Sequence, residues 1–298
     1  MSQRNERSGR IAIVGRPNVG KSTLLNALLG EPIAIISRHA QTTREPVRGV
    51  LTLGDVQYVF VDTPGLHAAR TRLGHWMNDV AREVARSADA VVLVVEPRVD
   101  PADVALAREL ERLPIVLAVN KVDRLAQKSE LLPLLAAFAH AHPFAATVPV
   151  SAKKADGTDR LLVELRALVP EQPFPYPTDT LSDQPVRRFV AEFVREQILA
   201  HTTQEVPHGA AVTVERFDES TPVPHIDVVV HVARESHKKI LIGAKGQMMK
   251  RIGMAARARV EQMLGQKVHI KIWVKTTPDW MNDPVKLREL GYLGEGQG

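Results

Sequence analysis

The chain has 298 residues and no cysteine, so disulfide bonds and thiolate metal sites are excluded, and its composition is compatible with a reducing, cytoplasmic setting. Its length favours about two domains, each with its own core. The formal net charge is +5, and the sequence contains neither a signal-peptide pattern nor an apolar run of about 18 residues, so we expect a soluble protein.

The first motif follows an apolar run near the N-terminus. Residues 11–14 predict a buried strand and residues 22–29 a helix that ends at Gly30, and residues 15–22 between them have the sequence Gly-Arg-Pro-Asn-Val-Gly-Lys-Ser. In such a loop, successive backbone N–H groups face a β-phosphate, and the helix directs its positive end toward it. We expect Lys21 to bridge the β- and γ-phosphates and Ser22 to bind Mg²⁺. The expected nucleotide contacts here are Gly15, Asn18, Val19, Gly20, Lys21, Ser22 and Thr23.

A polar segment, Gln-Thr-Thr-Arg at residues 41–44, is the expected first switch. One threonine hydroxyl would complete the Mg²⁺ shell only when a γ-phosphate is present. We favour Thr43 over Thr42, because Thr43 directly precedes Arg44 as in related GTPases. The alternative is an ordinary solvated loop.

The second phosphate motif, Asp-Thr-Pro-Gly, follows the apolar run 58–61. Ligands bind at the carboxyl ends of strands in open α/β sheets, so Asp62 is expected to hold Mg²⁺ through water and Gly65 to donate its N–H to the γ-phosphate. The next residue is Leu66, whereas many switch GTPases have a glutamine that orients water at this position.

With a leucine at this position, the chain resembles GTPases that have a hydrophobic residue there. In those GTPases, an asparagine matching Asn18 helps to bind a potassium ion near the phosphates. The resemblance implies that potassium stimulates turnover. No arginine finger is evident, so intrinsic hydrolysis is expected to be slow, on the order of 10⁻⁴ to 10⁻² s⁻¹. The residues expected to carry hydrolysis are Lys21, Thr43, Gly65 and Asn18.

Two further motifs predict that the base is guanine. Asn-Lys-Val-Asp at residues 120–123 follows the apolar run 114–119, and Ser-Ala-Lys at residues 151–153 follows residues 147–150. The Asp123 carboxylate can accept from both N1–H and the exocyclic amine of guanine, a donor pair that adenine lacks. Lys121 is expected along the base plane, and the Ala152 N–H is expected to reach guanine O6. The expected contacts are Asn120, Lys121, Asp123, Ser151, Ala152 and Lys153.

Five prolines between residues 170 and 185 follow an amphipathic helix expected at 158–169, and they predict a semi-stiff linker. Beyond it, one helix, two strands, two helices and a strand are expected. The first of these helices carries an apolar face at helical spacing, which favours a second core. Those residues are Val186, Phe189, Val190, Phe193, Val194 and Ile198.

A Gly-x-x-Gly loop between two of these helices is similar to the signature of a KH domain. Residues 234–275 contain eleven Lys and Arg against only Glu235 and Glu261, which favours a polyanionic partner. Individual charges here are equally explained as solvated surface. The expected RNA contacts of the loop and the following helix are Gly243, Ala244, Lys245, Gly246, Lys250 and Arg251.

The last expected strand alternates apolar and basic residues over 267–275. This alternation places Lys271 and Trp273 on the same face, away from the core, where the indole could stack on an unpaired base. The alternative is that the C-terminal segment carrying Trp280 covers Trp273. No histidine pair has the spacing of a helical zinc site, so satisfied or solvated histidines are expected.

Taken together, these motifs closely resemble the bacterial Era family of GTPases, and the resemblance covers nearly the whole chain. It implies an α/β P-loop GTPase domain, with a mostly parallel sheet flanked by helices, followed by a smaller α+β KH domain of the prokaryotic type. The implied segments are a polar extension (1–8), the GTPase domain (9–170), the linker (171–184), the KH domain (185–276) and a tail (277–298).

The resemblance further implies GTP, GDP and Mg²⁺ as ligands, binding near the 3′ end of small-subunit ribosomal RNA and assistance in assembling the small ribosomal subunit. It also implies peripheral association with the inner membrane, and a monomer is expected. Two alternatives remain open: a membrane-associated signalling GTPase whose C-terminal domain binds protein or lipid, and a constitutive RNA-binding protein that uses GTP as a structural ligand.

Overall fold

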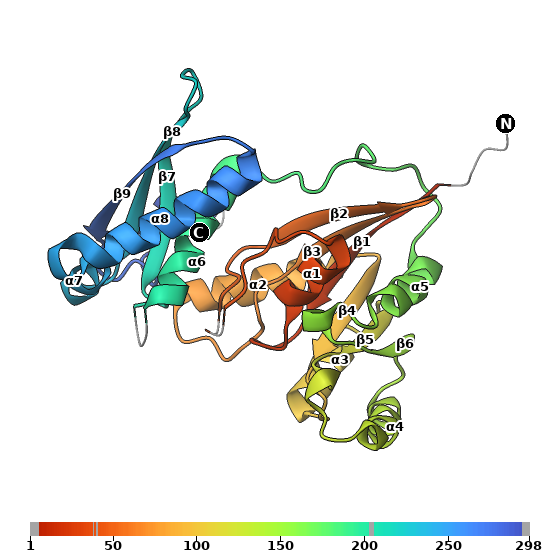
Figure 1. Cartoon of the computed structure of the whole chain (residues 1–298). Coiled ribbons are helices and arrows are strands. Elements are labelled where there is room, and N and C mark those ends of the chain that lie inside the picture. Colours follow the sequence, from red (N-terminus) through yellow and green to blue (C-terminus); the bar gives the residue numbers. More distant parts are fainter. Residues whose placement is uncertain (1–5, 38, 40, 203–205, 294–298) are drawn as a thin grey trace, which may run out of the picture. The chain divides into compact units, whose positions relative to one another are not determined.

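The computed structural model describes residues 6–37, 39, 41–202 and 206–293 (Figure 1). The chain divides into two compact units between Asp183 and Gln184, except that Ser37, His39 and residues 69–76 group with the second unit. Each unit has its own sheet. No helix in the described ranges is both long and apolar enough to cross a membrane.

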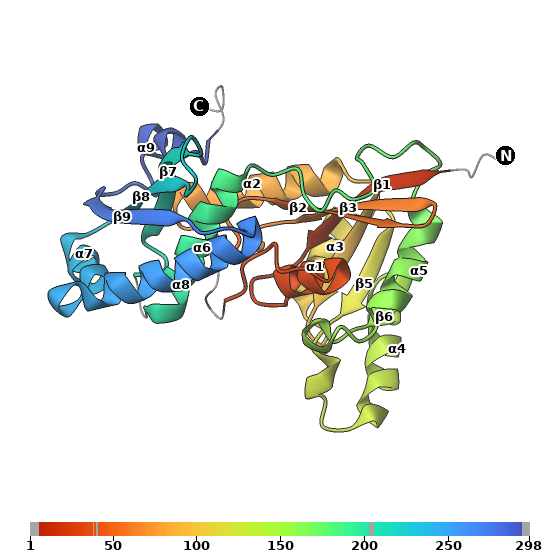
Figure 2. The ribbon, with the colours of Figure 1, turned by 45° about the horizontal axis from the view of Figure 1, so that its top comes forward.

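The first unit is built on a six-stranded sheet with the order β2-β3-β1-β4-β5-β6 (Figure 2). Only β2 is antiparallel to its neighbour, and every other pair is parallel. The central strands are fully buried and rich in Val, Ile and Leu, as expected for strands covered by helices on both faces. The strands are β1 (Arg7–Val14), β2 (Val47–Leu53), β3 (Val56–Asp62), β4 (Ala90–Val95), β5 (Ile115–Val119) and β6 (Ala146–Pro149).

Helices cover both faces of this sheet. Side chains from the C-terminal part of α2 and from α3 and α4 join one core cluster with β1, β4 and β5, whereas α1 and α5 pack on the other face. The helices are α1 (Lys21–Leu29), α2 (Arg72–Arg86), α3 (Pro101–Glu109), α4 (Leu131–Ala141) and α5 (Thr158–Leu168), with short 3₁₀ turns η1 (Val122–Arg124), η2 (Lys128–Glu130) and η3 (Ala152–Lys154). The parallel α/β architecture expected from the sequence is confirmed.

Strand β1 begins at Arg7, four residues before the strand expected from the apolar run. The Arg7 guanidinium donates two hydrogen bonds to the Val169 carbonyl oxygen, at 2.9 and 2.7 Å, and Ser8 Oγ donates to the Pro173 carbonyl at 2.8 Å. These polar residues therefore belong to the sheet and not to an extension. Partners more than 160 residues away hold them there.

The proline-bearing segment after α5 lies along β2, which is an edge strand. The Val50 N–H donates to the Leu181 carbonyl at 2.8 Å, and Ser182 Oγ donates to the Arg48 carbonyl at 2.6 Å. Gln57 exchanges two hydrogen bonds with the backbone of Tyr176. The segment expected to be a linker is thus fixed to the first unit up to about Ser182, where it covers an otherwise open sheet edge.

The second unit is a three-stranded sheet, β7-β8-β9, against which α6, α7 and α8 pack. Strand β7 is antiparallel to β8 and β9 is parallel to it, which gives the helix-strand-strand-helix-helix-strand order expected from the sequence. The apolar face of α6 is buried except near its start, where Val186 is exposed. The elements are α6 (Val186–His201), β7 (Ala210–Asp218), β8 (His225–Val232), α7 (Glu235–Ile242), η4 (Ala244–Gly246), α8 (Gln247–Leu264), β9 (His269–Thr276) and α9 (Pro284–Glu289).

Candidate functional site

The phosphate loop lies between β1 and α1 and has a conformation that its glycines allow. Gly15 and Gly20 have φ angles of 146° and 103°, and a Cβ on Gly20 would lie 2.3 Å from Asn120 Nδ2. Asn18 has a φ of 64°, a region in which asparagine is the best tolerated side chain after glycine. Val19 is buried, and Ser22 and Thr23 lie half-buried on the first turn of α1.

Lys21 is buried at the base of this loop. Its Nζ donates to the carbonyl oxygens of Gly15 and Arg16, both at 3.1 Å. Burial lowers the pKa of Lys21 to about 8, and the nearby Asp62 carboxylate partly opposes that shift. An anionic phosphate beside Nζ would raise this pKa again and stabilise the ammonium, so the site favours a polyanionic ligand.

Three oxygen-bearing side chains meet beside Lys21. Ser22 Oγ lies 2.6 Å from Asp62 Oδ2 and 2.9 Å from Thr43 Oγ1, and Thr43 Oγ1 lies 3.2 Å from the same carboxylate oxygen. Asp62 is completely buried, and among the described residues its Oδ1 has no hydrogen-bond partner. Burial raises the pKa of Asp62 to about 6. A buried, partly unsatisfied carboxylate with two hydroxyls fits a hard divalent cation such as Mg²⁺.

The Asp-Thr-Pro-Gly turn packs closely against the phosphate loop. A Cβ on Gly65 would lie 2.8 Å from the backbone N and Cα of Pro17, and the Leu66 N–H donates to the Gly15 carbonyl at 3.2 Å. The Leu66 side chain packs against the apolar core of the sheet. It therefore cannot orient a water molecule.

His67 connects the expected first switch, residues 41–44, to the Asp-Thr-Pro-Gly turn, a role that its isolation in the sequence did not reveal. Its Nδ1 lies 2.9 Å from the Gly65 carbonyl oxygen and its Nε2 lies 2.8 Å from Gln41 Nε2. Because a carbonyl only accepts, Nδ1 carries the proton and Nε2 accepts from the glutamine amide. The sequence signal that could have indicated this role is the position of His67 directly after the leucine that replaces glutamine.

Asn120 joins the base-binding end of the site to the phosphate loop. Its Nδ2 donates to the Val19 carbonyl at 2.8 Å, and its Oδ1 accepts from the Ala152 N–H at 2.9 Å. The Ala152 N–H, which is expected to reach guanine O6, is thus hydrogen-bonded to the side-chain amide oxygen of Asn120. The structure gives Asn120 a positioning role in addition to any contact with the base.

Asp123 is exposed at the end of β5 and is oriented by a neighbouring motif. Ser151 Oγ donates to Asp123 Oδ1 at 2.7 Å, and this hydrogen bond is the main reason that the pKa of Asp123 lies below its usual range. The carboxylate is therefore ionised and held in place, as an acceptor for the N–H groups of guanine requires. Lys153 is exposed on η3.

Lys121 also bridges loops. With a φ of 65°, it directs Nζ to the Asn18 carbonyl at 2.5 Å and to Glu96 Oε1 at 2.6 Å. The hydrogen bond from Lys121 is the main cause of a lowered pKa at Glu96. Sequence reasoning missed Glu96, although this carboxylate follows the buried strand β4 as Asp62 ends β3.

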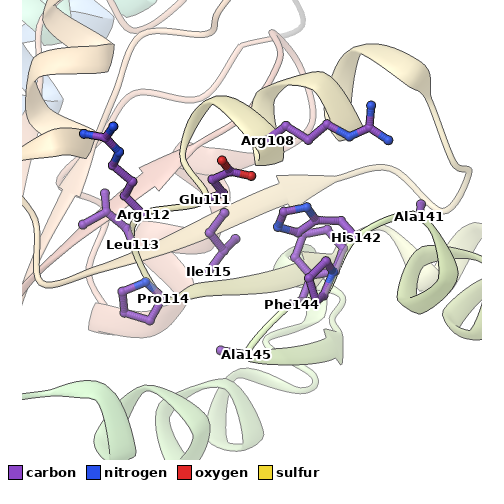
Figure 3. A pocket seen from close by; sticks show the side chains of 11 residues that line it. Arg108, Glu111, Arg112, Leu113, Pro114, Ile115, Ala141, His142, Phe144 and Ala145 are labelled. Carbon is purple, nitrogen blue, oxygen red and sulfur yellow. The ribbon is translucent and has the colours of Figure 1, made fainter.

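The base-binding and phosphate-binding groups therefore lie at the carboxyl ends of β1, β3, β4, β5 and β6. A separate hollow of about 880 Å³ lies at the opposite, amino ends of β5 and β6 (Figure 3). Glu111, Arg112, Ile115 and His142 are among its lining residues. None of the nucleotide motifs contributes to it.

A second candidate surface lies on the loop between α7 and α8. Gly243 has a φ of 70°, and a Cβ there would lie 2.7 Å from Met248 Cβ. Lys245 is exposed at a φ of 50°. Lys245, Lys250 and Arg251 have no salt-bridge partner among the described residues, and α8 begins at Gln247 directly after Gly246. An open basic loop at a helix N-terminus fits a phosphate backbone.

Trp273 and Lys271 lie on β9, on the face away from the helices. The Trp273 side chain is 48% exposed, whereas Trp280 is buried, stacks on Tyr292 and donates to the Gly209 carbonyl. Trp280 therefore does not bury Trp273.

Comparisons with known proteins agree with this geometry. Residues 10–121 match the family model described as 50S ribosome-binding GTPase, and residues 205–281 match the KH domain model. The chain is 41% identical over 291 residues to the GTPase Era of Ruminiclostridium cellulolyticum, covering 96% of this chain and 97% of the relative. It is 42% identical over 297 residues to the GTPase Era of Geotalea daltonii, covering 98% and 100% respectively.

Solved structures agree as well. A single-residue variant of Aquifex aeolicus Era bound to GDP·AlF₄⁻ superposes with a TM-score of 0.93 at 36% identity, over 97% of this chain and 100% of the other. The same values apply to Era in complex with MgGDPNP and nucleotides 1506–1542 of 16S ribosomal RNA. The nucleotide motifs, the KH unit and full-length similarity at this level of identity show that the chain is a GTPase and belongs to the Era family.

Proposed function

We propose that this chain is a guanine-nucleotide switch that binds small-subunit ribosomal RNA near its 3′ end and assists maturation of the small ribosomal subunit. The observation that carries the proposal is the presence, in one chain, of a buried phosphate site and of a separate basic Gly-x-x-Gly loop without salt-bridge partners among the described residues. A relative was solved with both MgGDPNP and 16S ribosomal RNA bound, which supports both halves.

In the proposed reaction, water attacks the γ-phosphorus, the bond to the β-γ bridging oxygen breaks, and GDP and phosphate leave. Lys21 and the N–H groups of the phosphate loop and Gly65 stabilise the charge that develops on the phosphate oxygens. Ser22, Thr43 and Asp62 would hold Mg²⁺, which neutralises phosphate charge when bound. Asp123 selects guanine, and Asn120 and Lys121 hold the base-binding end against the phosphate loop.

We further propose that potassium stabilises this charge, with Asn18 as one of its ligands. The Asn18 side chain is exposed beside the phosphate loop and makes no hydrogen bond to another described residue. Turnover is expected to be faster in potassium than in sodium for the wild type and equal in the two salts for Asn18→Ala. Equal wild-type rates in both salts would contradict the proposal.

The RNA-binding role is tested with the full chain and the 3′-terminal segment of small-subunit ribosomal RNA, against a scrambled RNA at a stated salt concentration. The double variant Ala244→Asp, Lys245→Asp places negative charge where the phosphate backbone would lie, and we expect it to lose selective binding. Lys267→Ala is the matched control, because Lys267 is already paired with Glu261 at 3.1 Å. Selective binding that survives the double variant would contradict the assignment of this loop.

We place the protein in the cytoplasm as a monomer, with peripheral contact to the inner membrane. The basic charge of the second unit supports an attraction to anionic surfaces. Sedimentation with anionic and neutral vesicles, with and without RNA, separates this contact from RNA binding. Strong vesicle binding together with no selective RNA binding would favour the membrane-associated signalling GTPase instead.

A further inference from the structure

The outer face of the second unit's sheet carries an exposed aromatic side chain between two cations. Exposure alternates strictly along β9, and Lys271, Trp273 and Lys275 all lie on the face away from α7 and α8. Their outermost Cα atoms are about 13 Å apart, given the rise of a strand. Trp273 is 48% exposed, a large fraction for an indole.

The two lysines are available to a ligand. Within the described part of the chain, neither ammonium has a salt-bridge partner, although Asp227 on β8 is the register neighbour of Lys271. The other acids of the sheet lie on β7, at the opposite edge. There Asp218 is paired with Arg216 and Ser220, and Glu215 accepts from Thr213. The β9 edge is therefore basic, and the β7 edge carries the paired acids.

Strand β9 also forms an edge of the sheet, next to the helices that flank the Gly-x-x-Gly loop. Helices α7 and α8 pack against β9 from the inner face, and β9 is the last strand in the order β7-β8-β9 (Figures 1 and 2). A chain of nucleotides that leaves the loop can therefore reach the outer face by passing around a single strand.

We propose that the outer face of β9 is a second RNA subsite, in which an unpaired base stacks on Trp273 and flanking phosphates contact Lys271 and Lys275. The inference rests on the proposed RNA-binding function and adds a surface distinct from the Gly-x-x-Gly loop. Aromatic side chains next to cations are the usual platform for single-stranded nucleic acid.

The composition of the face favours RNA over a protein partner. The neighbour of Trp273 across the sheet is Val229, which is half-buried, and the other nearby side chains on this face are polar or charged: Lys271, Lys275, Asp227 and the edge-to-face pair His225 and His269. Trp273 is the sole large apolar side chain that β9 exposes. A protein interface of ordinary size needs a wider apolar centre than this.

The test compares two RNAs with the full chain: a short 3′-end oligonucleotide that fills only the loop, and the same RNA extended in both directions. Trp273→Ala is expected to weaken binding of the extended RNA by roughly five- to a hundredfold and to leave binding of the short RNA unchanged. Trp273→Phe retains a stacking ring and should restore most of the affinity. Lys271→Ala and Lys275→Ala should each reduce the slope of log affinity against log salt by about 0.7, and the control Lys267→Ala should not.

Intrinsic fluorescence reports the same contact directly. Trp76 and Trp280 both pack on Tyr292, so Trp273 is the indole most open to a stacked base. Extended RNA should quench the wild type and should quench Trp273→Phe much less. This inference is overturned if Trp273→Ala keeps the wild-type affinity for the extended RNA while the loop variant still loses binding. If the wild type binds neither RNA selectively, the proposed function fails, and the inference fails with it.

Discussion

His67 Nε2 lies 2.8 Å from Gln41 Nε2, while Nδ1 of the same ring contacts the carbonyl oxygen of Gly65 at 2.9 Å. This contact joins the segment that carries Thr43 to the turn whose N–H is expected on the γ-phosphate. Since Leu66 cannot orient water, the alignment of these two segments is one means of positioning the reacting groups.

We predict that His67→Ala lowers kcat by roughly ten- to a hundredfold, because small misplacements of catalytic groups are costly. GDP affinity should not change, since the imidazole lies outside the base-binding end. Single-turnover hydrolysis is the measurement, with the exposed His140→Ala as control. A variant that hydrolyses GTP at the wild-type rate would exclude His67 from positioning.

Gly65→Ala tests the close approach of the two phosphate-binding segments. The added Cβ would lie 2.8 Å from Pro17 backbone atoms, so the turn has to move away from the phosphate loop. We expect hydrolysis to fall by about a hundredfold, as on loss of one oxyanion donor, with GDP binding retained. Retained hydrolysis would show that the Gly65 N–H does not serve the reaction.

Asp123→Asn tests base selection. The asparagine amide offers a donor where guanine also offers donors, so kcat/KM for GTP should fall by roughly 10²- to 10⁴-fold. Xanthosine triphosphate has a carbonyl in place of the exocyclic amine, and the variant should use it better than the wild type does. The comparison of the two nucleotides controls for misfolding, because an unfolded variant would use neither.

Asp62 predicts a specific pH dependence in the nucleotide-free protein. Burial raises its pKa from 3.8 to about 6, so between those values the folded state binds more protons than the unfolded state. The free energy of unfolding attributable to this group therefore falls as pH rises from about 4 to 6, by at most about 3 kcal/mol.

Asp62→Asn should remove this part of the slope, and the exposed Asp79→Asn should not. With Mg²⁺ and GTP present, the cation favours the carboxylate, so the added stabilisation should increase from pH 5 to 7 in the wild type only. Denaturant titrations at several pH values measure both effects. An identical slope in Asp62→Asn would contradict the assignment.

The chemistry of the first unit could be predicted because each motif follows an apolar strand and the carboxyl ends of parallel strands meet at one edge. That rule places Lys21, Asp62, Asn120 and Ser151 at that edge from the sequence alone. The order of elements in the second unit followed from periodicity in the same way. In both cases, local pattern and global topology agree.

Contacts between distant residues were not predictable. Arg7 is polar and gave no strand signal, yet the Val169 carbonyl holds it in β1. The prolines indicated a semi-stiff linker between the domains, but backbone groups of β2 fix the segment to the first unit. Glu96 and His67 lacked a motif because their roles depend on which loops lie beside them. Likewise, the alternation along β9 predicted that Trp273 lies on an outer face. Only the structure showed that the Trp273 indole is exposed, because Trp280 packs on Tyr292 and does not cover it.

The most direct test of the account is the affinity of the full chain for the 3′-terminal segment of small-subunit ribosomal RNA, measured with a non-hydrolysable GTP analogue and then with GDP at one salt concentration. If the nucleotide and RNA sites are coupled, the analogue-bound form binds more tightly, by a factor of roughly 5 to 150. Equal affinity in the two states would contradict the switch and leave GTP as a structural ligand of an RNA-binding protein.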